Sequence, residues 1–306
     1  MTSDPRVSAM DNFTPTTHSS PGATLQAALC LRGPYTACII GASRGVGAGV
    51  ALSYAKAGAT TLILAARNAA QLSAVAAQCA AINPACTVLT APCDVSSPTS
   101  VRALAGFARA ELGKQRQHLD AVVVVVNPGS AAQVELEEAA GTAADRQWAQ
   151  AFAVSGLGTY HAAHYLAPLL LEGAGRAFLA VGSIAACMRP GVAANSKDCI
   201  SKMAQVRIVE HVAAQFGARG LLSVAVHPGA VEAEMAVEAA PEAFKKNLVD
   251  DPELCGHFLV WLTREPGQFQ WLNGRLLSAN WDPDELLERK QQIIEGDLLK
   301  FEAKTE

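Results

Sequence analysis

The sequence predicts an α/β protein with a doubly wound parallel sheet in a single domain. Short apolar runs alternate with helical patterns along most of the 306 residues, at the spacing typical of βαβ units. Five consecutive valines at 122–126 suit a parallel strand that is buried on both faces. The apolar run 35–40 leads directly into a glycine-rich turn and a helical pattern. Right-handed crossovers are expected to join successive strands.

The expected elements follow one another in a regular order. Strand patterns lie at 35–40, 60–66, 87–91, 122–126, 177–181 and 221–226, and helical patterns lie at 46–57, 69–82, 98–112, 143–171 and 198–216. Ser97-Pro98 has the pattern of an N-cap followed by proline at the first helical position. Most of residues 1–33, rich in Ser, Thr and Pro, is expected to form a mobile arm, with docking of residues 23–31 as an open alternative. Residues 34–281 are expected to form the domain, and residues 282–306 a charged helical tail.

Composition excludes several classes of function. The formal net charge of -4 comes without a basic stripe, which gives no support to nucleic acid as a partner. No apolar run is long enough to span a bilayer and the N-terminus has no apolar signal core, so we expect a cytoplasmic protein without a membrane partner. The eight cysteines form no C-x-x-C pair and the histidines do not cluster, which predicts reduced thiols and no metal site.

The turn that follows the first strand is suited to a phosphate group. Glycines at 41, 45 and 47 allow backbone angles that other residues avoid, and they let a ligand approach without meeting a Cβ atom. The helix that begins here directs free N–H groups and a partial positive charge at the same place. The alternative interpretation is a tight strand-to-helix connection with no ligand, because a glycine-rich loop alone is a weak signal.

Residues that directly follow the predicted strands are expected to line one crevice. Ligands of open parallel sheets bind beyond the carboxyl ends of the strands. The residues at these ends are Gly41, Arg67, Asp94, Asn127, Ser183 and Pro228. The sequence therefore predicts a small-molecule site at this edge of the sheet.

Taken together, these residues resemble the short-chain dehydrogenase/reductase family, whose members are single-domain, Rossmann-type enzymes that move hydride to or from NAD(P). The resemblance covers residues 35–281 and includes a cofactor turn at 41–47, Asp94-Val95, a variant Asn-Pro-Gly turn at 127–129, and Pro228-Gly229. It implies these cofactor-binding residues: Gly41, Ser43, Arg44, Gly45, Val46, Gly47, Arg67, Asp94, Val95, Asn127, Lys202, Pro228, Gly229 and Val231. The segments 13–18 and 272–282 further resemble fungal members, many of which tailor secondary metabolites.

The choice between NAD and NADP follows from charge. A carboxylate at the end of the second strand would bind ribose hydroxyls and repel a 2′-phosphate. Here Ala65-Ala66 is followed by Arg67, and Arg44 lies in the glycine turn. Two guanidinium groups favour NADP(H). The alternative is that both arginines are solvated surface residues.

The catalytic positions implied by the resemblance are only partly retained. Ser183 matches the serine that polarises the substrate carbonyl, and Lys202 matches the lysine, with Lys197 as the poorer candidate. The family's tyrosine, expected four residues before Lys202, is replaced by Asp198, and its asparagine by Ser155. Ala233 replaces the usual threonine after Pro228-Gly229. Cofactor binding is therefore expected to be retained, whereas the proton relay is altered.

The replaced tyrosine leaves several functions open. Asp198 and Lys202 are expected to form an ion pair along one helix face. Because an ionised aspartate is a poor proton donor, ordinary ketone reduction is expected to be slow unless burial raises its pKa. The first hypothesis is an NADPH-dependent oxidoreductase that reduces an activated, iminium-like or carbonyl intermediate of secondary metabolism. The alternative is a non-redox cyclase, pericyclase or binding protein that keeps NADP(H) as a structural element, and a third is a silent partner in an oligomer.

The resemblance also implies an assembly and a lid. Family members often pair through two long helices, which correspond here to 143–171 and 198–216, so a homodimer or homotetramer is expected. Residues 235–246 follow the nicotinamide-side turn and are expected to form a mobile substrate lid.

Overall fold

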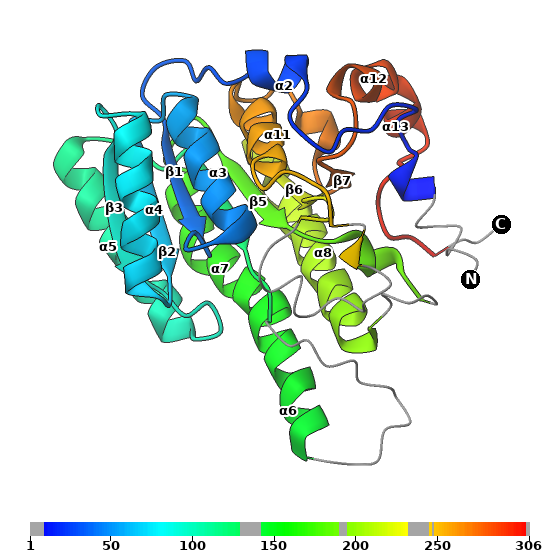
Figure 1. Ribbon diagram of the computed structural model, residues 1–306, viewed down its shortest axis with the longest axis horizontal. Coiled ribbons are helices and arrows are strands. Elements are labelled where there is room, and N and C mark those ends of the chain that lie inside the picture. Colours follow the sequence, from blue (N-terminus) through cyan, green and yellow to red (C-terminus); the bar gives the residue numbers. More distant parts are fainter. Residues whose placement is uncertain (1–8, 129–141, 190–194, 232–244, 247, 304–306) are drawn as a thin grey trace.

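The sheet at the centre of the protein has seven parallel strands. The computed structural model describes residues 9–128, 142–189, 195–231, 245–246 and 248–303. The strands, in the order β3-β2-β1-β4-β5-β6-β7 across the sheet (Figure 1), are all paired in parallel. Their bounds are β1 Thr36–Ile40, β2 Thr61–Ala66, β3 Thr87–Pro92, β4 Ala121–Val125, β5 Ala177–Val181, β6 Leu222–His227 and β7 Leu276–Ser278. The order reverses between β1 and β4, which confirms the doubly wound sheet that the sequence predicts.

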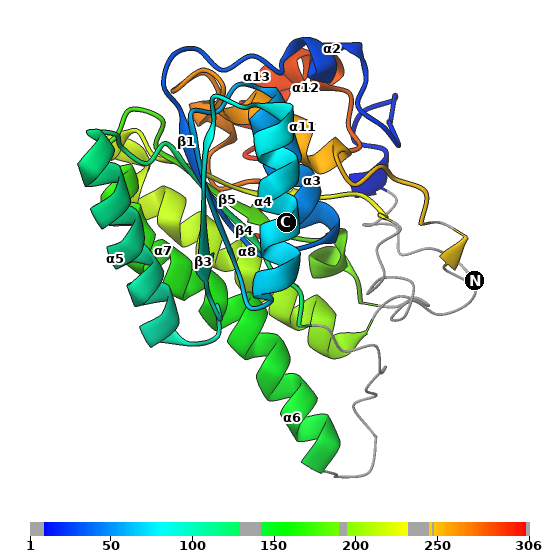
Figure 2. The same ribbon diagram turned by 60° about the vertical axis from the view of Figure 1, so that its left-hand side comes forward.

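Helices cover both faces of the sheet. Figure 2 shows α3 and α4 on one side of the strands, and α5, α7 and α8 on the other; α11 packs against α3. The long helices are α3 Gly45–Lys56, α4 Ala69–Ile82, α5 Pro98–Gln115, α6 Thr142–Ala151, α7 Gly158–Leu170, α8 Ser196–Phe216 and α11 Leu254–Thr263. Ser97 caps α5 as predicted, because its side chain accepts from the amide of Ser100, and Asn68 caps α4 by accepting from the amide of Gln71.

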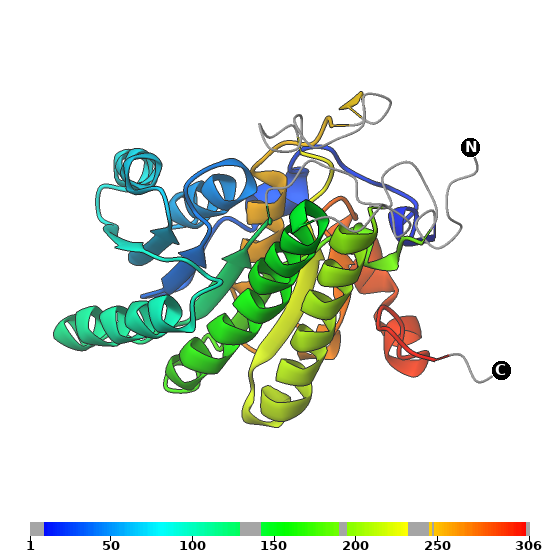
Figure 3. The same ribbon diagram turned by 90° about the horizontal axis from the view of Figure 1, so that it is seen from below.

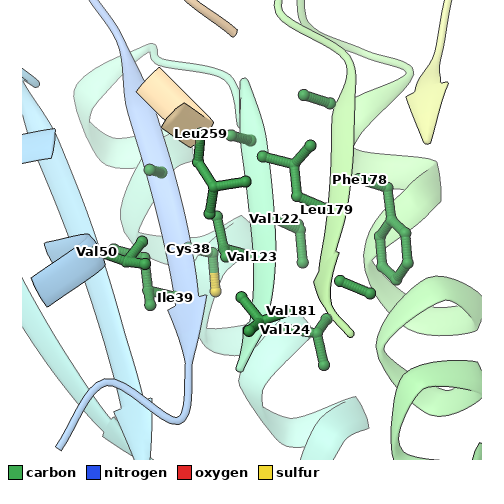
Figure 4. Packing of buried hydrophobic residues seen from close by; sticks show 14 of the residues in the cluster. Cys38, Ile39, Val50, Val122, Val123, Val124, Phe178, Leu179, Val181 and Leu259 are labelled. Atoms are coloured by element: carbon green, nitrogen blue, oxygen red, sulfur yellow. The ribbon is translucent and has the colours of Figure 1, made fainter. Parts of the chain in front are cut away.

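The core lies on both sides of the central strands. All residues of β1 are buried, as are all residues of β5, and only Val125 of β4 is half-buried. Figure 4 shows β-branched and leucine side chains of these strands packed with Val50 of α3 and Leu259 of α11. Burial on both faces explains why the valine run does not alternate with polar residues.

The helical pattern predicted at 143–171 is not one α-helix. Its middle, residues Phe152–Leu157, is a π-helix that joins α6 to α7, and the amide of Gly158 bonds to the carbonyl of Ala153, five residues earlier. A π turn holds one more residue than an α turn, and such turns are frequent at functional sites. Figure 3 shows α7 and α8 side by side below the sheet.

Residues 9–33 pack on the domain over more than the stretch 23–31, the part of the predicted mobile arm for which the sequence allowed docking. Leu25, in the short helix α2 Ala23–Ala27, is fully buried, and the indole Nε1 of Trp281 donates to the carbonyl of Met10 at 2.9 Å. The imidazole of His18 contacts the carboxylate of Asp282 at 2.9 Å. The segment is polar enough to resemble an arm, but its few apolar residues pack against the end of the domain.

The C-terminal tail also packs on its own chain. Two short helices, α12 Pro283–Glu288 and α13 Lys290–Glu295, form part of the predicted helical tail. The guanidinium of Arg275 pairs with Asp297, and the amide of Leu276 in β7 donates to the carbonyl of Leu299. All eight cysteines are free thiols. No helix among the described residues is long and apolar enough to cross a membrane.

Candidate active site

The glycine turn after β1 is packed too closely for side chains. Gly41 has a φ of +89°, and a Cβ atom on it would lie 1.8 Å from the carbonyl oxygen of Val125 in β4. A Cβ atom on Gly47 would lie 2.0 Å from the carbonyl oxygen of Gly41. Glycine is therefore required at both positions by the packing of the turn itself.

The helix that follows this turn begins without a side-chain cap. Arg44 is the N-cap residue of α3 and its side chain makes no capping hydrogen bond. The first amides of a helix need acceptors, and an anion can supply them. Ser43, Gly45 and Val46 are half-buried, and Arg44 is exposed. The turn therefore fits the phosphate groups of a dinucleotide.

The end of β2 lies beside the glycine turn. The amides of Gly41 and Ala42 both donate to the carbonyl of Ala65 in β2, at 2.7 and 3.2 Å. Arg67, two residues beyond Ala65, is exposed. The structure thus brings Arg67 to the same edge as the turn, as the strand order requires.

Asp94 and Val95 are held in the loop after β3. The Asp94 carboxylate accepts from the amide and hydroxyl of Ser96, at 3.0 and 2.7 Å, so it shapes this loop. Val95 is buried, and a Cβ atom on Gly158 of α7 would lie 2.9 Å from its methyl groups. Val95 therefore fixes the loop against α7.

The turn after β6 is clamped by a residue that the sequence analysis missed. Gly229 has a φ of +92°, and the carboxylate of Asp250 accepts from the amide of Ala230 at 2.5 Å. Val231 also forms a β-bridge with Asp250. Pro228 is half-buried and Val231 is buried. Because Asp250 lies beyond residues 232–244, no local pattern linked it to this turn. Ala233 and most of the predicted lid at 235–246 lie outside the described residues.

Ser183 ends β5 and begins a short helix. Its Oγ atom accepts from the amide of Ala185 at 3.1 Å, as the N-cap of the 3-10 helix η2, Ile184–Cys187. The side chain is half-buried. A capping hydroxyl still has its own hydrogen to donate. Ser183 can therefore cap η2 and polarise a ligand oxygen at the same time. Asn127, exposed after β4, lies at the same edge of the sheet.

Lys202 is the buried cation of this edge. Its ammonium donates to the carbonyl of Val126 at 2.8 Å, that of Val181 at 3.4 Å, and Oε1 of Gln205 at 3.0 Å. Only 8% of the residue is exposed. Burial lowers the pKa of Lys202 from 10.5 to about 8, although the nearby Asp198 opposes this shift. Lys197 instead donates to Gln147 of α6 at 2.9 Å, which leaves Lys202 as the lysine at the strand ends.

Asp198 lies one turn before Lys202 on α8 but does not receive its hydrogen bonds. The sequence predicted a direct ion pair, whereas the Lys202 ammonium is directed at two strand-end carbonyls and a glutamine. Burial raises the pKa of the Asp198 carboxyl above its usual value, and the positive charges of Lys197 and Lys202 oppose this. Asp198 is therefore a half-buried carboxyl that is easier to protonate than an exposed one.

Two polar atoms near these groups are buried without a hydrogen-bond partner. They are Oγ of Ser155, in the π-helix, and Nδ1 of His227, at the end of β6. Burial, and secondarily the charge of Lys202, lowers the pKa of His227 to about 4, so this imidazole is neutral at neutral pH. The described residues contain no group of three or more His, Cys, Asp or Glu side chains that could hold a metal ion.

A family model and several curated relatives that match this chain are all described as short chain dehydrogenases. Residues 35–243 match the family model described as short chain dehydrogenase. The chain is 36% identical over 288 residues to "Short chain dehydrogenase mpl6" of Monascus purpureus, covering 93% of this chain and 94% of the relative. It is 32% identical over 297 residues to "Short chain dehydrogenase andI" of Emericella variicolor, covering 96% and 97%.

Solved structures share the fold at lower identity. A 7α-hydroxysteroid dehydrogenase complexed with NADH and 7-oxo glycochenodeoxycholic acid superposes with a TM-score of 0.70 at 20% identity, over 83% of this chain and 96% of that one. The Pseudomonas aeruginosa RhlG/NADP active-site complex gives a TM-score of 0.68 at 21% identity, over 82% and 96%. At this identity the likeness establishes the arrangement of strands and helices alone.

Proposed function

The chain belongs to the short-chain dehydrogenase family, and on this premise we propose that it is an NADP(H)-dependent reductase of a small-molecule intermediate, in which Asp198 stands in place of the family's tyrosine. The family is one of oxidoreductases that use a nicotinamide cofactor. The close relatives come from fungi, which supports a role in the tailoring of secondary metabolites.

Charge at the glycine turn supports NADP(H) over NAD(H). The uncapped start of α3 and the required glycines fit a pyrophosphate, which the amides of residues 45–47 would bind. Arg44 and Arg67 would hold a 2′-phosphate, and β2 ends in alanine where a carboxylate would exclude it. When bound, the reduced cofactor supplies a hydride.

The observation that carries the proposal is the buried Lys202 with a half-buried carboxyl one turn before it. Lys202 is fixed by the carbonyls at the ends of β4 and β5, so its charge is held at the edge where ligands of such sheets bind. The raised pKa of Asp198 makes it a better proton donor than an ordinary aspartate. In its ionised form the same carboxylate stabilises a neighbouring cation.

Asp198 therefore suits a substrate that is positively charged or easily protonated. An iminium carbon accepts hydride without a proton on the same atom, and Asp198 would stabilise its charge. For a carbonyl substrate, the Ser183 hydroxyl would donate to the oxygen and Asp198 would have to deliver the proton. We propose the iminium-like substrate as the preferred class, and a carbonyl intermediate as the second.

The test uses purified full-length protein with NADPH and two probes, N-methyl-3,4-dihydroisoquinolinium and an aryl ketone. Wild type is expected to oxidise NADPH faster with the iminium probe. Asp198→Asn is expected to lower kcat by about 10²-fold or more, with NADPH affinity retained. Asp198→Tyr is expected to improve ketone reduction. Unchanged iminium turnover in Asp198→Asn contradicts the role of Asp198.

One observation favours a second function. An ionised Asp198 is a poor proton donor to a ketone oxygen, whereas Lys202, held by the carbonyls of Val126 and Val181, could still support a bound nucleotide. A non-redox cyclase, pericyclase or binding protein would use the site in this way. Replacing NADPH by NADP⁺ in the presence of the natural substrate separates the two functions, because reduction must stop and a non-redox conversion continues.

Exposed apolar side chains support the expected homodimer or homotetramer. Leu157, Tyr160, Ile200 and Met203 are 53%, 48%, 42% and 46% exposed, on the π-helix, α7 and α8. These helices lie side by side (Figure 3). Light scattering on Tyr160→Glu checks the assembly, because a charge at the centre of such a contact is expected to give a monomer.

A further inference from the structure

A chain of hydrogen bonds inside the protein links Lys202 to the π-helix. The Lys202 ammonium donates to Oε1 of Gln205 at 3.0 Å, and Nε2 of Gln205 donates to Oγ1 of Thr159 at 3.0 Å. The Thr159 hydroxyl donates to the carbonyl of Ser155 at 2.7 Å. Gln205 and Thr159 are both 0% exposed. The chain therefore crosses the buried contact between α8 and α7.

The direction of every hydrogen bond in this chain is fixed by its two ends. An ammonium can only donate, and a backbone carbonyl can only accept. The Gln205 amide must therefore turn its oxygen to Lys202 and its nitrogen to Thr159, and the Thr159 hydroxyl must donate to Ser155. A network with one permitted arrangement holds its members in fixed relative positions.

Packing alone does not account for the two polar residues. Gln205 lies on the same face of α8 as Val206, Val209 and Val212, which are buried apolar residues. A buried amide is costly unless it is fully hydrogen-bonded, and an apolar side chain of similar size would fill the space without that cost. What the glutamine adds is an acceptor for the third hydrogen of the Lys202 ammonium.

At its other end the chain holds the turn that carries Ser155. The Thr159 hydroxyl bonds to the Ser155 carbonyl, within the segment where the helix changes from π to α. The Ser155 hydroxyl is buried and makes no hydrogen bond to the described residues. The chain therefore connects two residues of the candidate active site, Lys202 and Ser155, through two residues that are not part of it.

We propose that Gln205 and Thr159 are positioning residues of this site: they hold the Lys202 ammonium charged and in place, and they fix the Ser155 turn relative to it. This inference rests on the proposed function only in taking Lys202 as a residue of the site. The sequence analysis named neither residue.

Few other charges act on Lys202, so the effect of Gln205 can be measured. Asp198, on the same helix, raises the pKa of Lys202, and the His227 imidazole, at the end of β6, is neutral at neutral pH. The groups bonded to the ammonium from β5 and from the loop after β4 are backbone carbonyls, which do not titrate. Gln205 is thus the one neutral side chain that bonds to the ammonium among the described residues.

The experiment follows the titration of Lys202 in the full-length, ligand-free protein. Protein labelled with [ε-13C]lysine is titrated by NMR, and the Lys202 signal is assigned by its loss in Lys202→Met. Gln205→Met is expected to lower the Lys202 midpoint by about one pH unit, because the charged form loses a hydrogen bond. Gln205→Glu is expected to raise it, because a carboxylate favours the ammonium.

A further pair of variants and a packing control separate positioning from packing. Thr159→Val is expected to lower the midpoint, and Thr159→Ser, which retains the hydroxyl, to leave it unchanged. Ser223→Ala is the packing control, because it removes another buried hydrogen bond of α8, between the Ser223 hydroxyl and the Val209 carbonyl. It is expected to lower stability without moving the Lys202 titration.

A midpoint in Gln205→Met equal to that of wild type overturns the proposal. If that variant does not fold, Gln205→Glu decides, and a midpoint at or below that of wild type is the contrary result. An unchanged midpoint in Thr159→Val removes Thr159 from the proposal. Because no cofactor or substrate is used, these outcomes are independent of the NADPH oxidation assay, whose failure would contradict only the proposed function.

Discussion

Asp198 and Lys202 stand one turn apart on α8, and each shifts the pKa of the other in the direction opposite to that of burial. Burial alone would favour a neutral carboxyl and a neutral amine, whereas their attraction favours the charged pair. Burial is the larger effect for both groups, so the pKa of Asp198 is raised and that of Lys202 is lowered, each toward neutral pH. Groups of this kind serve in proton transfer as well as in charge stabilisation.

The first prediction concerns the pH dependence of stability. The pKa of Lys202 falls from 10.5 in the unfolded chain to about 8 in the folded protein, so the unfolded chain binds more protons between these values. The stability of wild type relative to Lys202→Met is therefore expected to rise with pH across this window, by roughly 3 kcal/mol in total. Urea denaturation at pH 7.5, 8.5 and 9.5 measures the trend.

The control for this prediction is Lys114→Met. Lys114 is an exposed residue of α5 that pairs with Glu111, and it is expected to show no comparable trend. Parallel pH curves for wild type and Lys202→Met would contradict the burial of a charged Lys202.

The second prediction concerns cofactor choice. Arg67→Glu places a carboxylate after β2, where it is expected to repel a 2′-phosphate and weaken NADPH binding by about 10- to 100-fold. NADH binding is expected to change less or to improve. Thermal-shift titrations with both cofactors check this. Arg109→Glu is the control, because Arg109 of α5 pairs with Glu172, after α7, and not with a residue of the glycine turn. An equal response of both cofactors to Arg67→Glu would argue against NADP(H) at this position.

The third prediction compares two glycines with the same backbone angle. Gly41 and Gly58 both have a φ of +89°, but only Gly41 has an atom, the Val125 carbonyl oxygen, within 4 Å of its added Cβ. Gly58→Ala is expected to cost about 1–2 kcal/mol from the backbone angle alone. Gly41→Ala is expected to cost several times more or to prevent folding. Urea denaturation of both variants measures the difference, and similar costs would mean that the turn can move away from β4.

The fourth prediction concerns the N-terminal segment. A truncation that removes residues 1–19 takes away the Met10 carbonyl bonded to Trp281 and the ring of Phe13, 4.9 Å from that indole. It is expected to lower the free energy of unfolding by about 2–4 kcal/mol, because buried apolar contacts are lost. A truncation that removes residues 1–8 only is the control. If both truncations have the stability of the full chain, the docked segment contributes nothing to stability.

The sequence predicted the strands that are long and fully apolar, and missed what depends on contacts between distant segments. The valine run of β4 and the start of α5 at Ser97-Pro98 were identified from local patterns, which those residues carry by themselves. The short strand β7 was missed because Leu276–Ser278 are too few to show a period and are placed by pairing with β6. Docking of residues 23–31 was left open by the sequence, but the packing around Met10 was missed because its partner, Trp281, lies at the other end of the chain.

The residues of the candidate site also fall into those that the sequence could predict and those that it could not. Its strand-end residues could be predicted, since a parallel sheet brings the carboxyl ends of its strands to one edge. Gln205 could have been noticed, because it falls on the buried face of α8 three residues after Lys202. Asp250 and Thr159 could not have been noticed in this way. Asp250 bonds to Ala230 and Thr159 to Gln205, and only the fold brings these distant residues together.

The π-helix at Phe152–Leu157 also determines which face α6 presents to α8. One extra residue in a turn rotates everything before it by about 100° relative to a continuous α-helix. In this orientation Gln147 of α6 accepts a hydrogen bond from the buried Lys197 of α8 at 2.9 Å. A deletion of one residue within 152–157 would restore a regular helix and turn Gln147 away, leaving the buried ammonium of Lys197 without that acceptor. The additional residue thus sets the alignment of a whole helix, and its loss would act at a distance from the place where it occurs.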